Sequence, residues 1–249
     1  MAGHSHWAGI KHKKAAVDAK RGKAWSKIAR MIIVAAKQGG GDPAANLTLR
    51  YAIDKAKAAN MPKDTIEKAI KRGTGDVEGS NFEEVLYEGY GPSGVAVMVE
   101  ALTDNRNRTV PEIKRIFEKH GGSLGTTNCV SYLFNKKGLI TVSTASAEED
   151  DLMELALGAG AEDMENTGDV YELTCDPSAY EQLKKALEEK EIPMEVAEIS
   201  MVPLTMIPIT DEQTARRIIS LMEAIEDHDD VQNAYANFDI PEETLAKVS

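Results

Sequence analysis

Lysine and arginine side chains recur at short intervals through residues 11–30 of this chain. Ammonium and guanidinium groups are hydrogen-bond donors that bind phosphate oxygens, Lys as a point charge and Arg as a planar fork. Asp18 is the only acidic residue between positions 1 and 41, so these cations have few internal partners nearby. A phosphate backbone is the polyanion that such donors fit. The candidate nucleic-acid-binding residues of this segment are Lys11, Lys13, Lys14, Lys20, Arg21, Lys23, Lys27 and Arg30.

Charge is divided unequally along the sequence. The first 75 residues hold 12 lysines and 4 arginines against 5 acidic residues, so this segment carries +11. Because the whole chain of 249 residues carries −12, residues 76–249 carry −23. A basic element that binds a polyanion is thus attached to an acidic body that the same polyanion repels. The alternative interpretation of the basic segment is a solvated, lysine-rich helix surface.

An amphipathic helix positions the central cations of this segment. Over residues 22–39, apolar residues recur at the spacing of one helix face, from Trp25 to Ala36. Lys23, Lys27 and Arg30 fall on the opposite side of the same helix. We therefore expect these three side chains to face solvent, and we expect their replacement to leave folding nearly intact.

Two shorter helices are predicted to complete a bundle with the first. The pair Asp42-Pro43 is typical of a helix N-terminus, with Asp as the cap and Pro at the first helical position. A third helix is predicted over residues 62–72, with Gly73 capping its C-terminal end. Three helices with short connections make a small bundle, which we assign to residues 1–75.

A second basic element is the polar stretch at residues 104–109, which leads from a predicted strand into a predicted helix. Two arginines at a helix N-terminus form an anion site, so Arg106 and Arg108 join the candidate nucleic-acid-binding residues. The alternative is structural, with the arginines paired to acids of their own domain. The helix itself is expected to begin with a capping box between Thr109 and Glu112.

The rest of the chain alternates short strands with helices, the last of which is predicted over residues 212–226. Residues 134–202 follow the order strand, helix, strand, strand, helix, strand, which is the ferredoxin-like pattern. The flanking pieces, 82–133 and 203–249, are predicted to form one discontinuous middle domain around it. A strand pair with its turn at residues 135–138 is expected near the junction. The predicted fold class is therefore α+β multidomain, a three-helix bundle followed by two intertwined α+β domains.

Motifs for enzymes and metals lack the context that they need. Residues 89–94 match G-x-G-x-x-G, but a β-branched strand follows instead of a helix, so we interpret them as a hairpin loop. The acidic run at 226–230 is interpreted as a solvated turn, and Cys129 and Cys175 as inert residues. We predict no catalytic residue, metal, cofactor or small-molecule substrate, and we keep an uncharacterised enzyme as a distant alternative.

Hydropathy and cysteine usage indicate the compartment. No stretch approaches the roughly 20 apolar residues that a membrane-spanning helix needs, and no apolar signal precedes the basic segment. Two cysteines cannot form a disulfide framework. The sequence therefore predicts a cytoplasmic protein with no membrane partner.

Several short motifs together are specific to one family. They are the opening residues 2–7, the stretches 11–14, 18–23, 39–43, 60–62 and 87–92, the segment 104–109 (DNRNRT), and the glycine-rich 121–125. In these motifs the chain resembles the YebC family nearly from end to end. The resemblance implies a helical N-terminal bundle, two intertwined α+β domains and no enzymatic activity. It also implies a role in gene expression, because bacterial members are known as probable transcriptional regulators that bind DNA. Mitochondrial relatives activate translation, and bacterial members are also linked to ribosomes.

The composition of the basic side favours one class of partner. Lysine contacts phosphate but carries little sequence information, whereas reading a promoter takes side chains that hydrogen-bond base edges. A body of charge −23 is repelled by an extended duplex, but it fits a ribosomal cavity if the basic domain docks on rRNA or tRNA. We therefore expect a ribosome-associated role in translation, with promoter-DNA binding and transcription regulation as the close alternative.

Overall fold

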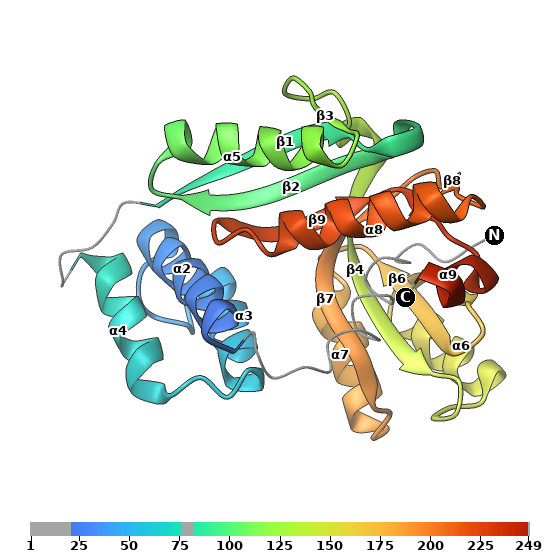
Figure 1. Ribbon diagram of the computed structural model, residues 1–249. Coiled ribbons are helices and arrows are strands. Elements are labelled where there is room, and N and C mark those ends of the chain that lie inside the picture. The colour runs from blue at the N-terminus through green and yellow to red at the C-terminus, as the bar shows by residue number, and fades with distance from the viewer. Residues whose placement is uncertain (1–20, 76–81, 249) are drawn as a thin grey trace.

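The computed structural model describes residues 21–75 and 82–248, and the first of these parts is three packed helices (Figure 1). They are α2 (Arg21–Gly39), α3 (Leu47–Ala58) and α4 (Lys63–Thr74). Their shared core is apolar, with the fully buried Ile32 and Leu49 at its centre. The predicted three-helix region is confirmed, and the buried side of α2 is the one that its periodicity indicates.

Helix α3 begins four residues later than predicted, because Asn46 rather than Asp42 caps it. The Asn46 side chain accepts a hydrogen bond from the Leu49 amide at 3.0 Å. It also donates to the carbonyl oxygens of Ala35 and Gly40, each at 2.8 Å. One buried side-chain amide therefore caps α3 and fixes it to the end of α2.

Helix α4 ends two residues later than predicted, and its C-cap is Gly75 instead of Gly73. Gly75 is the C-cap, with the left-handed φ of 86°. Gly73 lies inside the helix, where an added Cβ would be 2.4 Å from the Ile33 carbonyl oxygen and 2.6 Å from the Ala36 Cβ. Gly73 is thus required for the close approach of α4 to α2.

A four-stranded antiparallel sheet of order β3-β1-β2-β9 begins the second part. Its strands are β1 (Glu83–Tyr90), β2 (Ala96–Thr103), β3 (Ser123–Leu124) and β9 (Val231–Ala236). The G-x-G-x-x-G residues span the end of β1 and the turn that joins it to β2, so the predicted hairpin is confirmed. Since β9 comes from near the C-terminus, this sheet combines two distant parts of the chain.

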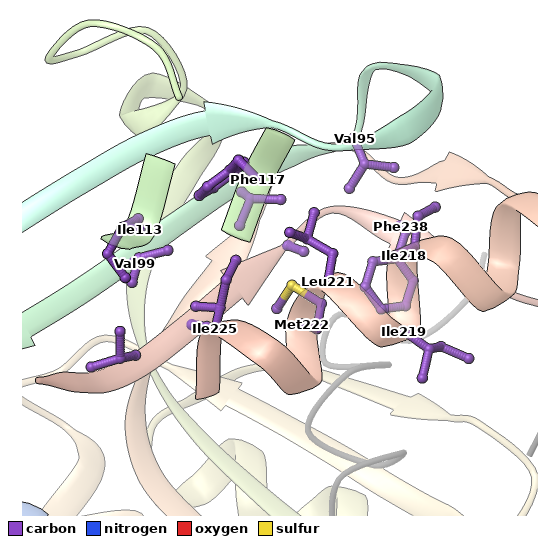
Figure 2. Packing of buried hydrophobic residues seen from close by; sticks show 14 of the residues in the cluster. Val95, Val99, Ile113, Phe117, Ile218, Ile219, Leu221, Met222, Ile225 and Phe238 are labelled. Atoms are coloured by element: carbon purple, nitrogen blue, oxygen red, sulfur yellow. The ribbon is translucent and has the colours of Figure 1, made fainter. Parts of the chain in front are cut away.

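Two helices, α5 (Arg106–Lys119) and α8 (Glu212–Glu226), pack against this sheet (Figures 1 and 2). Helix α8 has the predicted bounds, and Asp211 caps it by accepting a hydrogen bond from the Thr214 amide at 2.7 Å. The core between the helices and the sheet, drawn in Figure 2, includes Val95, Val99, Ile113, Phe117, Ile218, Leu221, Met222 and Ile225. The parallel pair β8 (Ile207–Pro208) and β10 (Phe238–Asp239) and helix α9 (Glu242–Val248) complete this unit.

The second sheet is antiparallel and has the order β5-β6-β4-β7. Its strands are β4 (Phe134–Ser143), β5 (Ala161–Asn166), β6 (Val170–Cys175) and β7 (Met194–Pro203). Helices α6 (Glu149–Gly158) and α7 (Tyr180–Glu189) supply the crossovers and pack in its core. Numbered within this unit, the strand order is 2-3-1-4, which is the predicted ferredoxin-like arrangement.

The predicted strand pair around residues 135–138 was wrong. Residues 131–133 form a 3-10 turn, and β4 runs unbroken through the polar stretch that was taken for a turn. Position 138 of this strand is a glycine because β6 and α7 pack closely there: an added Cβ would be 2.6 Å from the Cys175 Sγ and 3.0 Å from the Tyr180 Cβ. A glycine needed for close packing was therefore mistaken for a turn residue.

The two sheets and the helical bundle support the division of the chain into three domains. The boundaries at 75, 82, 134 and 203 stay a prediction. The bundle contacts both neighbours, and on the ferredoxin-like side Tyr51 of α3 meets Tyr180 of α7 edge to face, with ring centroids 6.2 Å apart.

Candidate nucleic-acid interface

The cations on the outer side of α2 lie against the C-terminal end of α8, so Lys23 is exposed as expected, whereas the expectation was wrong for Lys27 and Arg30, which are half-buried. We call these two groups the α2 face (Lys23, Lys27 and Arg30) and the α8 turn (residues 226–230). The Lys23 Nζ donates a hydrogen bond to the Asp227 carbonyl oxygen at 3.2 Å. The other two side chains donate to the carbonyl oxygens of Glu226 and Asp229. The last carbonyls of a helix lack partners within the helix and lie at the negative end of its dipole, so cations stabilise them.

Asp230 is the acceptor on which Arg30 of the α2 face and two residues of α5 converge. Its side chain is 3% exposed, and its carboxylate accepts hydrogen bonds from the Arg30 Nη1 at 3.2 Å and the Arg108 Nη2 at 2.7 Å. The Thr109 hydroxyl donates to the same carboxylate at 2.7 Å. One carboxylate therefore connects α2, the start of α5 and the segment between α8 and β9.

The hydrogen-bond donors around Asp230 keep its carboxyl group ionised. Burial alone would raise the pKa of this carboxyl group. The hydrogen bonds from Arg108 and Thr109, together with the positive charges of Arg108 and Arg30, outweigh burial and hold the pKa below its usual value. Asp230 is therefore an ionised acceptor between two guanidinium groups.

Residues 106–109 of the DNRNRT segment form the first turn of α5, and Asn105 is its N-cap. The Asn105 side chain accepts from the Arg108 amide at 3.2 Å, so the helix begins before the predicted capping box. That prediction was wrong, because Thr109 is buried within the helix and its hydroxyl lies 2.8 Å from the hydroxyl of Thr103. The Thr109 hydroxyl therefore binds the Asp230 carboxylate and does not cap the helix.

Both arginines of this segment have partners inside the protein. The Arg106 Nε lies 2.9 Å from a Glu83 carboxylate oxygen, and Arg108 pairs with Asp104 at 3.1 Å as well as with Asp230. Capping and internal pairing, the structural alternative for this segment, are therefore present. A role of Arg106 and Arg108 in binding nucleic acid stays a prediction.

Four of the predicted binding residues, Lys11, Lys13, Lys14 and Lys20, lie outside the described residues. Arg21 is the first residue of α2, and its side chain is likewise outside the described part. Their assignment stays a prediction.

A separate cationic surface lies on the outer side of α4. It consists of Lys68, Lys71 and Arg72, which we call the α4 face. All three side chains are exposed, on the side of the helix opposite the buried Ile66 and Ala69. Within residues 21–75 and 82–248, these side chains form no ion pair. Unlike the α2 face, the α4 face is therefore open to an external anion.

Sequence reasoning missed the role of the α8 turn, which it interpreted as solvated. The available signal was the coexistence of a +11 segment and a dense acidic cluster in one chain, since such charges attract each other. In the part of the chain that the structure describes, no group of three or more His, Cys, Asp or Glu side chains is placed to hold a metal ion. No described helix combines the length and apolar character needed to cross a membrane.

Comparison with known proteins gives matches along almost the whole chain. Residues 5–76 match the family description "TACO1/YebC protein N-terminal domain", and residues 82–238 match "TACO1/YebC second and third domain". A relative from Dictyoglomus thermophilum is 54% identical over 250 residues, covering all of both chains, and is named "Probable transcriptional regulatory protein". A relative from Natranaerobius thermophilus with the same name is 52% identical over 98% of this chain and 99% of its own.

A solved structure gives the same result for the fold. The crystal structure of a conserved hypothetical protein from Aquifex aeolicus superposes with a TM-score of 0.84 at 52% sequence identity. The match covers 95% of this chain and 98% of that one. Both parts of the chain thus match one family in sequence, and the whole arrangement matches a solved fold, so the chain belongs to the TACO1/YebC family.

Proposed function

We propose that this protein is a nucleic-acid-binding regulator of gene expression whose basic N-terminal domain docks on a phosphate backbone. The observation that carries the proposal is the α4 face, three exposed cations on one side of a packed helix, in a segment of net charge +11. Phosphate binding needs long cationic donors on one solvent-facing surface, held by a small core. The remaining residues proposed for binding are Lys11, Lys13, Lys14, Lys20, Arg21, Lys23, Lys27, Arg30, Arg106 and Arg108.

We place this function on the ribosome, in translation, with rRNA or tRNA as the partner. The α4 face presents lysine and arginine, which bind phosphate and can also bind guanine edges, but it lacks the Asn or Gln side chains that read adenine edges, so its means of reading a promoter sequence are limited. The acidic body of −23 would be repelled along an extended duplex. The second candidate is a DNA-binding transcriptional regulator, which the shared name of the curated relatives favours.

The proposal is tested on the α4 face with a matched control. The test variant is Lys68→Gln, Lys71→Gln, Arg72→Gln, and the control removes three exposed cations of the acidic body, Lys119→Gln, Lys136→Gln, Lys190→Gln. If each α4 side chain neutralises one phosphate, the slope of log affinity against log salt should flatten by roughly 2 to 3 in the test variant. The slope of the control variant should match the unmodified protein.

Two binding assays in parallel separate the two candidates. We expect the unmodified protein and the control variant to sediment with ribosomes in the same part of a salt series, and we expect the test variant to leave the ribosome pellet at a lower salt concentration. Promoter-selective gel shifts on duplex DNA without ribosome sedimentation would instead establish the transcriptional candidate. Absence of both interactions at low salt would refute the proposed function.

A further inference from the structure

We propose that the α8 turn is an internal competitor of nucleic acid, which occupies the α2 face and must release it before those cations can bind phosphate. The proposal rests on the proposed function and adds a regulated site to it. The arrangement described above is then the closed state of the protein. The open state presents the α2 face and the α4 face to the same polyanion.

The contacts of the α2 face make the two interactions mutually exclusive. Lys23 and Arg30 donate to the carbonyl oxygens of Asp227 and Asp229, and Arg30 also pairs with the Asp230 carboxylate. A phosphate group offers the same kind of acceptor, an anionic oxygen, to the same ammonium and guanidinium protons. Because a second anion would be repelled by the acidic turn beside it, phosphate binding requires the turn to leave.

The contact between α2 and the α8 turn is polar, and its outer part is open to water. The ammonium and guanidinium groups at the ends of long side chains form this contact with backbone carbonyl oxygens and carboxylates. Water reaches its outer part, where the Lys23 side chain is 56% exposed and the Asp229 side chain is 68% exposed, with 3.9 Å between their charged atoms. Its inner part, Arg30 with Asp230, is 20% and 3% exposed, and Asp230 keeps Arg108 and Thr109 as donors when Arg30 leaves. Solvent-exposed ion pairs are weak and are screened by salt. A polyanion with many phosphates can therefore compete for these cations.

The other contacts of the bundle with the body are also small. Besides the edge contact between Tyr51 and Tyr180, the Gln38 side chain lies 3.3 Å from Glu84, and the Arg30 guanidinium lies over the Phe82 ring at 5.5 Å from its centroid. Phe82 is the first described residue of the body, so the body begins beside the contact that must open. Domain interfaces made of a few polar and edge contacts permit relative motion.

The test opens the α8 turn without touching the proposed binding residues. The turn variant, Asp227→Lys with Asp229→Lys, places positive charge at two exposed positions beside the α2 face. The control variant, Glu154→Lys with Asp163→Lys, changes the net charge equally at exposed positions of the ferredoxin-like unit. The turn substitutions and the control substitutions are each also introduced into a chain carrying Lys23→Gln and Lys27→Gln, which lacks two cations of the α2 face. Affinity for a fluorescein-labelled RNA hairpin and a DNA duplex is measured by anisotropy at one salt concentration.

We expect the turn variant to bind RNA about tenfold more tightly than the control variant. A closed fraction of about nine in ten molecules lowers apparent affinity by that factor, and opening removes the loss. In the Lys23→Gln, Lys27→Gln chain, the difference between turn and control variants should fall below about twofold. Equal affinity of the turn and control variants, or a gain that survives without the two lysines, would overturn the proposal. Absence of binding by every variant would instead refute the proposed function.

Hydrogen exchange on the unmodified full chain gives a second, independent measurement. If nucleic acid replaces the turn, amide exchange in residues 226–231 should become faster when the RNA hairpin is bound. Exchange in β5, which lies in the other sheet, should stay unchanged. Bound RNA with unchanged or slower exchange in residues 226–231 would show that the α2 face stays docked, and would contradict the proposal.

Discussion

Replacing Asp230 with alanine should destabilise the protein far more than replacing its neighbour Asp229. The Asp230 carboxylate is 3% exposed and accepts hydrogen bonds from Arg30, Arg108 and Thr109. Asp229 is 68% exposed, and its carboxylate lies 3.9 Å from the Lys23 ammonium group. The two substitutions remove the same chemical group from adjacent positions, so their difference isolates the buried network.

The magnitude follows from what the partners can do after the change. Breaking a fully buried ion pair costs about 3–5 kcal/mol, because the remaining charge is left without water. Here Arg108 is 44% exposed and Arg30 is 20% exposed, so both guanidinium groups can be partly hydrated. Thr109 keeps its hydrogen bond with Thr103 at 2.8 Å. We therefore expect Asp230→Ala to lower the free energy of unfolding by about 2–3 kcal/mol, and Asp229→Ala to change it by less than about 0.5 kcal/mol.

Thermal unfolding at neutral pH measures this difference. For a chain of this size, about 2–3 kcal/mol corresponds to a decrease of the midpoint by roughly 4–12 °C. Asp230→Asn should fall between the unmodified protein and Asp230→Ala, since an amide oxygen still accepts hydrogen bonds but carries no charge. Equal midpoints for the Asp229→Ala and Asp230→Ala proteins would refute the assignment of Asp230 as the centre of the network.

The same network gives stability a defined pH dependence. Since the pKa of Asp230 is lower in the folded protein than its ordinary value, the unfolded chain takes up a proton first as the pH falls. The contribution of Asp230 is thus complete above the ordinary aspartate pKa of about 3.9 and is lost as the pH falls through the lower folded-state pKa. The difference in midpoint between the unmodified and Asp230→Ala proteins should shrink in that acidic range. A difference that stays constant there would contradict an ionised Asp230.

Two further predictions concern a loop and a helix contact. The buried Glu88 carboxylate accepts hydrogen bonds from the amides of Asn128, Val130 and Ser131 at 2.7–2.8 Å, so Glu88→Ala should lower the free energy of unfolding by about 2–4 kcal/mol and speed amide exchange in residues 125–131. A Glu88→Ala protein with unchanged exchange there would contradict this role. Gly73→Ala should push α4 from α2 and lower the thermal midpoint by an amount equivalent to about 1–3 kcal/mol, whereas Lys71→Ala on the exposed side should leave it unchanged. Equal midpoints of these two variants would show that the close approach at Gly73 is not required.

The sequence predicts correctly those helices and strands whose ends are set by residues within the same segment. Helix α8 has the predicted bounds because its apolar spacing and its Asp211 cap are both read within one segment. The start of α3 was misplaced because Asp42-Pro43 has the form of a helix N-terminus. The true cap, Asn46, also depends on carbonyl groups of α2 that only the tertiary fold brings near. Gly73 and Gly138 were misinterpreted for the same reason, since close packing against another element is not visible from flanking residues.

The candidate site shows the same division between local and distant information. The cationic side of α2 is a pattern within one helix, so the sequence reveals it directly. Its partner in this structure, the α8 turn, lies about 200 residues away in the chain, as the separation of Arg30 and Asp230 shows. Charge composition predicts that such segments attract each other, but it does not say which cations meet which acceptors. The exposed state of α4 and the occupied state of α2 could therefore be distinguished only from the fold.

An intramolecular partner also changes how the charge of the basic segment should be counted. Under the proposed function, each α2 cation that moved from the α8 turn to a phosphate would release counterions from the nucleic acid, while the vacated carboxylates of the turn would gain counterions from solution. The two exchanges have opposite dependence on salt, so the α2 cations would contribute less to the salt slope than their number suggests. The α4 cations have no such partner among the described residues and would contribute in full. The net charge of +11 would therefore overestimate the phosphates that this arrangement can neutralise, because the fold decides which part of that charge is available.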